Sequence, residues 1–215
     1  MKSALRHFRK LAQLVVAYGF CALAVAGSYE DFFRATATDD AGTVRTLIQR
    51  GFDANSRDSQ GQTALYLALR GESFNVAEAL LKDSSVDVNA LNASDESALM
   101  IAALKGQTDW TRRLIERGAQ INKPGWSPLH YAATGPDTAA VKLLLDRGGD
   151  INAESPNRTT PLMMAAQYGN EASVELLLAR GADAKARNDR GLSAGDFARL
   201  AKREALATRL DALGR

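Results

Sequence analysis

Histidine and cysteine are the residues on which catalytic or metal chemistry would most readily rest, and they are scarce in this chain. It has two histidines and one cysteine among 215 residues. A zinc site needs several nitrogen or sulfur ligands, which this composition does not provide. The adjacent acidic pairs at 39–40 and 95–96 lack the spacing of an EF-hand calcium loop, so we interpret them as solvated loop charges. We therefore predict no metal and no other cofactor.

Catalytic motifs are also missing from the sequence. It contains no nucleophile elbow, no phosphate-binding loop and no dinucleotide-binding fingerprint. A catalytic site needs titratable groups that converge in a cleft, and no such set stands out. His130 lies inside a recurring motif and is interpreted as a structural hydrogen-bonding residue. We predict that the chain is not an enzyme, and keep an enzyme only as an alternative.

An internal repeat in the sequence predicts the secondary-structure elements on which these residues lie. Four segments share an opening of Thr or Ser, Ala or Pro, Leu, two variable residues and Ala, and their starts are 34, 30 and 33 residues apart: Thr63–Ala68, Ser97–Ala102, Ser127–Ala132 and Thr160–Ala165. A second signature built on Arg-Gly precedes or follows the openings, at Arg50–Asn55, Arg117–Asn122, Arg147–Asn152 and Arg180–Lys185. Such periodicity is typical of repeat architectures.

The pattern resembles the ankyrin repeat, which has a T-P-L-H-x-A opening and a period of about 33 residues. Ser127–Ala132 and Thr160–Ala165 match it best, and the resemblance covers residues 28–215. It implies an all-α solenoid of stacked helix–turn–helix units with β-hairpin or loop fingers. We expect four full repeats between two degenerate caps, with approximate bounds 28–60, 61–94, 95–124, 125–157, 158–190 and 191–215.

The residue types at individual positions of the repeat have physical explanations in this fold. The Thr or Ser of each opening can cap the first helix of its repeat, and Pro128 and Pro161 fall at the first helical position, where a missing N–H costs nothing. Gly118, Gly148 and Gly181 are expected to end the second helices in the left-handed conformation. Leu144 is expected to be buried between repeats, and Trp110 to belong to the core.

Two repeats depart from the common length. The segment around Ser84 carries one extra residue and lacks the stopping glycine. Five positions separate Asn122 from Ser127, whereas eight separate Asn152 from Thr160, so the intervening finger is three residues shorter. Trp126 lies in this shortened finger. It is expected either to face the groove as a binding residue or to plug the gap.

A stacked array has a concave surface made of finger loops and the exposed edges of the inner helices. Aromatic and arginine side chains dominate protein interfaces, which favours a protein partner of unknown identity. The predicted protein-binding residues are Trp126, Tyr168, Arg70, Arg158, Lys105, Leu104, Gln167 and Gln60. Gln62, Asn92 and Asn188 are also expected to point from the fingers toward this surface.

The first 26 residues have the composition of a secretory signal. Four basic residues are followed by an uncharged apolar run and the sequence Ala24–Ala26. We expect cleavage after Ala26 and a periplasmic domain of residues 27–215. An uncleaved membrane anchor is the alternative. The remaining domain holds 23 basic and 25 acidic residues, no cysteine and no evident basic cluster, so we expect no nucleic-acid partner.

Three functions are compatible with the sequence. The first is a non-catalytic interaction module of the periplasm or cell envelope, expected to be monomeric on its own and without a membrane span after signal removal. The second is an immunity-type inhibitor that covers the active site of a toxin or enzyme. The third is an enzyme. The mixed charges of the predicted surface favour the first over the second, because an inhibitor of a basic toxin should present an acidic face.

Overall fold

The computed structural model describes residues 27–214, in which helices alternate with loops. The predicted signal sequence lies outside the described residues. The helices form antiparallel pairs, one pair per repeat: residues 27–37 with α2 (Ala41–Gln49), α3 (Ala64–Gly71) with α4 (Phe74–Lys82), α5 (Ala98–Leu104) with α6 (Thr108–Glu116), α7 (Pro128–Thr134) with α8 (Ala139–Asp146), α9 (Pro161–Tyr168) with α10 (Glu171–Ala179), and α11 (Ala194–Leu200) with α12 (Glu204–Leu213). The predicted all-α solenoid is confirmed.

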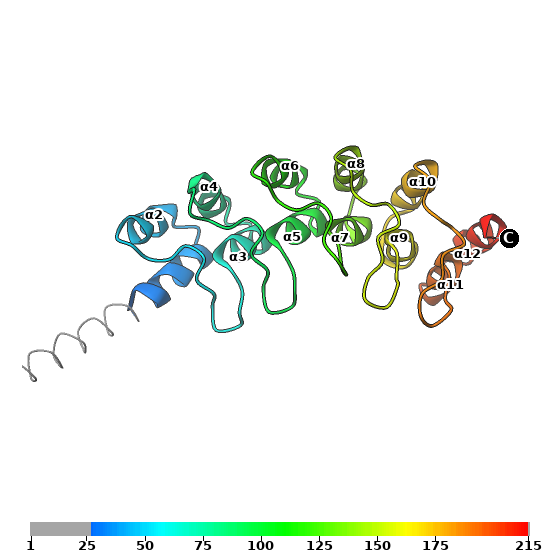
Figure 1. Ribbon diagram of the computed structural model, residues 1–215, viewed down its shortest axis with the longest axis horizontal. Coiled ribbons are helices and arrows are strands. Elements are labelled where there is room, and N and C mark those ends of the chain that lie inside the picture. Colours follow the sequence, from blue (N-terminus) through cyan, green and yellow to red (C-terminus); the bar gives the residue numbers. More distant parts are fainter. Residues whose placement is uncertain (1–26, 215) are drawn as a thin grey trace, which may run out of the picture.

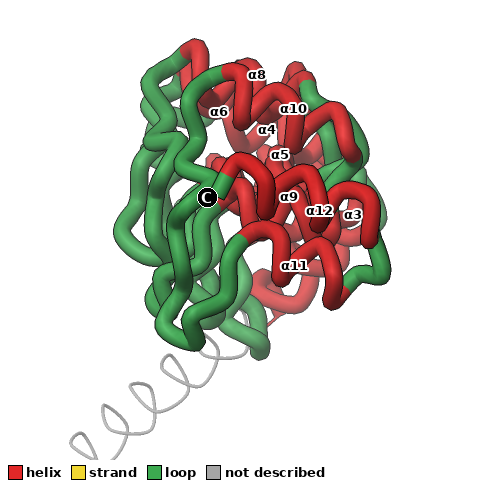
Figure 2. Tube along the Cα trace, turned by 90° about the vertical axis from the view of Figure 1, so that its right-hand side faces the viewer, coloured by secondary structure: helices red, strands yellow, loops and turns green. Residues whose placement is uncertain are grey.

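The pairs stack side by side into an elongated, curved array. Inner helices α3, α5, α7, α9 and α11 contact one another in that order, and α2, α4, α6, α8 and α10 form an outer row (Figure 1). The loops that connect one repeat to the next gather on one side of the stack, as the view along the array shows (Figure 2). The molecule therefore has a helical convex edge and a second edge made of loops.

The local signals of the sequence act as expected. The side chains of Thr63, Ser97 and Thr160 accept hydrogen bonds from backbone N–H groups in the first turn of α3, α5 and α9. α7 and α9 begin at the two prolines. The glycines that follow α6, α8 and α10 have φ values of 94°, 87° and 91°, in the left-handed region where a side chain is strained.

The core lies between the two helical rows and runs the full length of the array. Paired alanines on the inner helices, such as Ala132 and Ala133, are fully buried and allow α5, α7 and α9 to approach closely. Leu144 of α8 is also fully buried, as predicted. Trp110 of α6 is only partly buried; its ring stacks on Phe74 of α4 at the edge of the core.

Both terminal repeats keep a helix pair although their sequences diverge. Residues 27–37 form a helix whose Phe32 is fully buried, without the usual opening motif. At the other end, the guanidinium of Arg203 donates to the carbonyls of Ala165, Ala166 and Gly169 at distances between 2.9 and 3.1 Å. It thereby adds a donor for carbonyls at the end of α9, where helix termini lack part of their intrahelical bonding; the carbonyl of Ala165 also accepts from the backbone N–H of Gly169 at 3.0 Å.

We name the inter-repeat loops as fingers one to five: residues 50–63, 83–97, 117–127, 147–160 and 180–193. Of the two forms expected for the fingers, β-hairpin or loop, the structure has loops. Within residues 27–214 there is no strand, and one isolated antiparallel bridge joins Arg57 to Thr63. The third finger is visibly shorter than its neighbours (Figure 1). In the second finger, the carboxylate of Asp83 accepts from the amide and hydroxyl of Ser85, where the other repeats use glycine.

Candidate functional site

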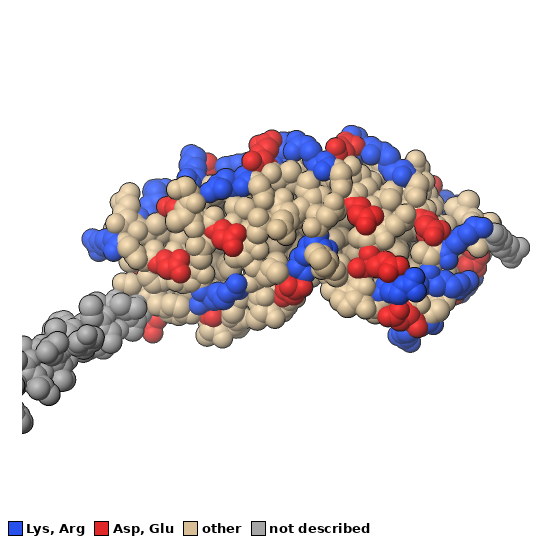
Figure 3. All heavy atoms as spheres, viewed as in Figure 1, with Lys and Arg blue, Asp and Glu red and all other residues tan. Residues whose placement is uncertain are grey.

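An apolar pocket lies on the loop side of the array, next to the shortened finger. Its volume is about 450 Å³. The space-filling view shows the lower outline of the molecule hollowed at this place, between the second and fourth fingers (Figure 3). We call it the α7 pocket. It is lined by Leu104 from α5, Trp126 from the third finger, His130, Tyr131 and Thr134 from α7, and Met164 and Tyr168 from α9.

Three of the predicted binding residues meet in this pocket. Leu104, Trp126 and Tyr168 come from three consecutive repeats and line the same space. The side chain of Tyr168 is 62% exposed, an unusual position for a large aromatic residue with no partner of its own. Gln167 is partly exposed beside it but does not line the pocket. A surface of this kind is typical of an interaction site.

Trp126 lies at the base of the third finger, immediately before α7. Its ring meets the imidazole of His130 edge-on, with ring centroids 5.3 Å apart and an interplanar angle of 76°. Gly125 precedes it with a φ of 77°, which turns the short finger back toward the helix. The indole is partly buried, and it also faces the pocket. It thus packs on the first turn of α7 while one part stays accessible.

His130 forms the back wall of the pocket and is held in one tautomer. The backbone N–H of Ser127 donates to its Nδ1 at 3.1 Å, so Nε2 carries the proton and donates to the carbonyl of Thr159 at 2.9 Å. The residue is fully buried. Burial lowers the pKa of His130 below its ordinary value of 6.5, although the hydrogen bond to Thr159 acts in the opposite direction. The predicted structural role is confirmed: a neutral imidazole ties the third finger to the fourth.

Two other repeats use methionine where His130 stands. The amide of Ser97 donates to the sulfur of Met100 at 3.1 Å, and the amide of Thr160 donates to the sulfur of Met163 at 3.4 Å. A sulfur is a weak acceptor, and it has no second group that could reach the next finger as Nε2 of His130 does. Among the three repeats that carry His or Met at this position, the α7 repeat alone has a side chain that reaches the next finger.

A carboxylate adjoins the pocket through Tyr131. Glu96 accepts hydrogen bonds from the hydroxyls of Tyr131 at 2.9 Å and Tyr66 at 2.8 Å, and from the amide of Asn92 at 2.8 Å. Partial burial opposes its ionisation, but these hydrogen bonds prevail and keep the pKa of Glu96 below its usual value. Burial, followed by the hydrogen bond to Glu96, raises the pKa of Tyr66 to about 12 and that of Tyr131 further.

This network corrects one interpretation of the sequence. Glu96 was expected to be a solvated loop charge, whereas it joins three consecutive repeats: Tyr66 lies in α3 and Tyr131 in α7. Tyr131, Thr134 and Met164 were also missed as pocket residues. Tyr131 and Met164 both directly follow the fourth residue of an opening motif, and that shared position is the signal that could have identified them.

The charged residues predicted for the surface have partners within the chain. Lys105 pairs with Glu72 at 2.8 Å, and Arg158, at the tip of the fourth finger, pairs with Glu154 at 3.2 Å. The guanidinium of Arg70 lies 5.8 Å from the centre of the Tyr66 ring, in cation–π geometry. None of these three lines the α7 pocket. Arg70 belongs to α3, Lys105 to the end of α5 and Arg158 to the fourth finger.

The predicted finger residues divide into two groups. Gln60 is exposed and accepts a hydrogen bond from Gln62 at 2.7 Å. Gln62, Asn92 and Asn188 are buried, contrary to the expectation that they point toward a partner. The reason is local: the side-chain oxygen of Asn92 accepts from the amides of Ser94 and Glu96, and Asn188 does the same in the fifth finger. These side chains shape the fingers.

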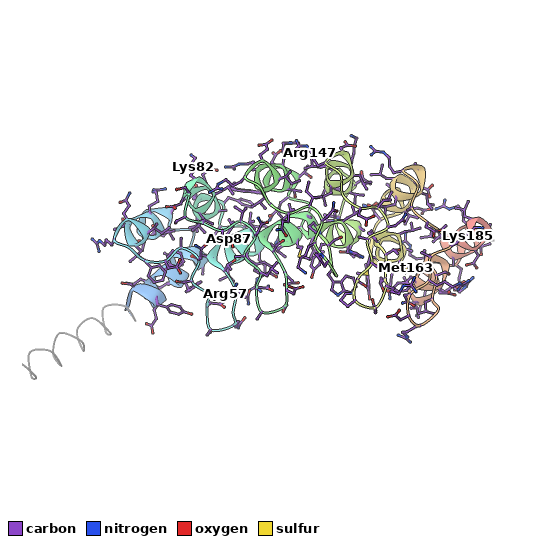
Figure 4. The ribbon with its side chains drawn as sticks, in the orientation of Figure 1. Arg57, Lys82, Asp87, Arg147, Met163 and Lys185 are labelled. Atoms are coloured by element: carbon purple, nitrogen blue, oxygen red, sulfur yellow. The ribbon has the colours of Figure 1, made fainter. Side chains whose placement is uncertain are left out.

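The visible face carries mixed charges. Basic and acidic side chains alternate across it (Figure 3), and Lys82 and Arg147 lie along the outer helical edge while Arg57 lies on the first finger (Figure 4). Within residues 27–214, no three His, Cys, Asp or Glu side chains are grouped as a metal ion would require. In the same part of the chain, no helix combines the length and the apolar character needed to cross a bilayer.

Comparison with known proteins identifies the fold. The family model for ankyrin repeats in three copies matches residues 32–124 and again 122–188. This chain belongs to the ankyrin-repeat family. Among curated relatives, it is 36% identical over 118 residues to the B-cell lymphoma 3 protein homolog of Mus musculus, and 30% identical over 146 residues to alpha-latrocrustotoxin-Lt1a of Latrodectus tredecimguttatus. These alignments cover 52% and 65% of this chain, but only 26% and 10% of the relatives.

A solved structure resembles nearly the whole ankyrin-repeat chain. It is a chain from the complex of the Bd0816 predatory endopeptidase of Bdellovibrio bacteriovorus with the immunity protein Bd3460. The TM-score is 0.71 at 26% sequence identity, and the match covers 85% of this chain and 97% of that one. Ankyrin-repeat domains are typically non-catalytic, and membership of the family implies a protein-binding module.

Proposed function

We propose that this ankyrin-repeat chain is a non-catalytic interaction module whose concave finger and inner-helix face binds a partner protein at the α7 pocket. The observation that carries the proposal is the pocket itself, where exposed Tyr168 and partly exposed Trp126 stand beside Leu104. Large aromatic side chains around a concave apolar space are the usual centre of a protein interface, because they bury much area at a small entropic cost.

We also propose that the module acts in the periplasm or cell envelope. The support is the basic, apolar and small-residue succession of residues 1–26. The domain that would remain has no cysteine and therefore does not depend on disulfide chemistry. An oxidising compartment is compatible with such a chain.

An inhibitor of an enzyme is the second candidate. The likeness to a chain of an endopeptidase–immunity protein complex, over 97% of that chain, favours it. In this form of the proposal, the α7 pocket holds a surface segment of an envelope enzyme while neighbouring fingers cover its active site. The mixed charge of the visible face (Figure 3) argues for recognition by shape and apolar contact over long-range electrostatic attraction.

The experiment is a quantitative co-purification from native cell envelopes. Tagged chain of residues 27–215 is compared with the double variant Trp126→Ala/Tyr168→Ala and with Lys82→Ala/Arg147→Ala on the outer edge as the matched control. The proposal predicts that one protein is recovered by the unmodified chain and the control but lost with the pocket variant. Recovery that depends on the outer edge alone would refute it. If the recovered protein is an enzyme, its activity is measured with and without the chain. Loss of activity favours the inhibitor, and unchanged activity favours the interaction module.

A further inference from the structure

The shortened third finger opens the α7 pocket to a protruding object. The second and fourth fingers both extend past the third (Figure 1), and the outline of the molecule is hollowed between them (Figure 3). Packed helices are about 8–10 Å apart, so beyond the end of the short third finger its two neighbours are separated by roughly 20 Å between backbones. After side chains are allowed for, this gap admits a hairpin loop, whose two strands lie about 5 Å apart.

The lining of the pocket at the base of this gap carries no formal charge, and the Glu96 carboxylate that adjoins it already accepts from Tyr131, Tyr66 and Asn92. The imidazole of His130 is neutral for the reasons given above, and the raised pKa keeps the Tyr131 hydroxyl protonated. Two lysines close in sequence to lining residues are paired within the chain: Lys123 with Asp95, and Lys105 with Glu72. Burying a charged side chain in such a place without a partner is costly. An occupant should therefore present an uncharged, apolar group.

The shape of the pocket sets the size of that group. It follows α7 from Trp126 to Thr134, with Leu104 on one side and Met164 and Tyr168 on the other. The seven residues of α7 span roughly 10 Å along the helix axis. Indole and phenol rings offer edges and faces to another ring, and the flexible thioether of Met164 adapts to its outline. One aromatic or long aliphatic side chain with its flanking backbone matches this space.

We propose that the occupant is a protruding loop of a folded partner, which passes between the second and fourth fingers and inserts one uncharged aromatic or long aliphatic side chain into the α7 pocket. This inference rests on the proposed function and adds the form and chemistry of the partner's contact. An extended peptide lying across several repeats would meet the second and fourth fingers, which project on both sides of the recess. A loop enters at one repeat only.

The test rebuilds the missing length of the finger. Inserting Ser-Asn-Gly between Pro124 and Gly125 restores the common length while retaining Trp126. The same insertion between Asp189 and Arg190 in the fifth finger is the matched control. The probes are disulfide-closed peptide loops with Phe, Leu, Lys, Glu or Ala at the apex, together with the linear Phe and Leu peptides. Binding is followed by Trp126 fluorescence in the full mature chain carrying Trp110→Phe, and circular dichroism verifies folding of every variant.

We expect Phe and Leu loops to bind at least about tenfold more tightly than the Lys, Glu and Ala loops and than the linear forms. The insertion after Pro124 should abolish this preference and weaken binding of the co-purified partner by a similar factor. The control insertion should change neither the preference nor the partner's affinity. Equal binding of linear and closed peptides, equal binding of charged apices, failure of every loop, or a partner indifferent to the insertion would each overturn the inference. In those cases a partner that still requires Trp126 and Tyr168 leaves the proposed function standing. A partner indifferent to both residues removes the proposed function itself.

Discussion

The edge of the Trp126 indole rests against the imidazole of His130, with centroids 5.3 Å apart, and this contact joins a binding surface to a structural link. His130 is fixed by Ser127 on one side and by Thr159 of the next finger on the other. The indole is therefore placed by a rigid part of the repeat, although it belongs to a loop. Such preorganisation lowers the entropic cost of using it in an interface.

The free energy of unfolding should decrease as the pH is lowered below 6.5, through the protonation of His130. The pKa of His130 is lowered in the folded chain, mainly by burial, whereas the unfolded chain titrates near 6.5. Below pH 6.5 the unfolded state therefore binds a proton that the folded state does not. The free energy of unfolding should decrease on acidification, by up to about 1.4 kcal/mol per pH unit, until the folded-state pKa is reached. Urea denaturation of residues 27–215 between pH 5 and 7.5 measures this slope.

The control is His130→Met, because methionine fills the same repeat position at Met100 and Met163. It should remove the slope between pH 5 and 6.5, while costing stability through the lost hydrogen bond to Thr159. Carboxylates with lowered pKa values act in the same direction only at lower pH, near and below their usual values: Asp40, Glu78, Asp83, Glu96, Asp146 and Asp196. An identical slope in the methionine variant would assign the pH dependence to another group.

Truncation of Leu144 should destabilise the array. Its side chain is fully buried in α8 within the continuous core. Leu144→Ala removes apolar area and leaves a cavity, so we expect a loss of about 2–5 kcal/mol. Lys142→Ala, two residues earlier on the exposed face of the same helix, should change stability little. Chemical denaturation detects both effects, including partial unfolding of a linear array. An unchanged midpoint for Leu144→Ala would show that this position is not a core contact.

Glu96 should contribute to stability as a hydrogen-bond acceptor. Glu96→Ala leaves the hydroxyls of Tyr66 and Tyr131 without their acceptor, and we expect a cost of about 1–3 kcal/mol. Glu96→Gln retains one carbonyl oxygen and should cost less. Thermal or urea denaturation ranks the three proteins. If glutamine and alanine are equally harmful, the negative charge is the essential feature; if neither is harmful, the network is not a link between repeats.

Export predicts a defined mature terminus. Cleavage after Ala26 would leave a chain that begins at Gly27. N-terminal mass spectrometry of native protein from envelope fractions gives the answer directly. Recovery of a membrane-bound form that still contains residues 1–26 would replace periplasmic release with anchoring.

Most of the fold could be predicted because the repeat signals are local. Pro128 and Pro161 mark helix starts through their missing N–H, and Gly118 marks a helix end through its left-handed φ. The site was only partly predictable. Trp126 and Tyr168 were identified because large aromatic residues stand at exposed repeat positions. Glu96 was misinterpreted because two of its three partners, Tyr66 and Tyr131, lie in neighbouring repeats, and a single repeat does not reveal which side chains meet across the stack.

The two buried asparagines of the fingers were also not predictable from the sequence, but for a local reason. Asn92 and Asn188 occupy loop positions where polar side chains usually face solvent, yet each turns inward to hold its own backbone. Their sequence context does not distinguish these two outcomes. The length of a finger is different, because a deletion of three residues is visible in the alignment of repeats, and the structure shows its consequence as the recess at the α7 pocket.

The affinity of the Trp126→Ala variant for the co-purified partner, measured together with its unfolding free energy, tests the central claim most directly. The indole lines the α7 pocket and contacts His130 from outside the core. Removing it should weaken partner binding by about 2 kcal/mol or more and lower stability by less than about 1 kcal/mol. An unchanged affinity, or an affinity that falls only in proportion to the unfolded fraction, would contradict the assignment of this pocket as the binding site.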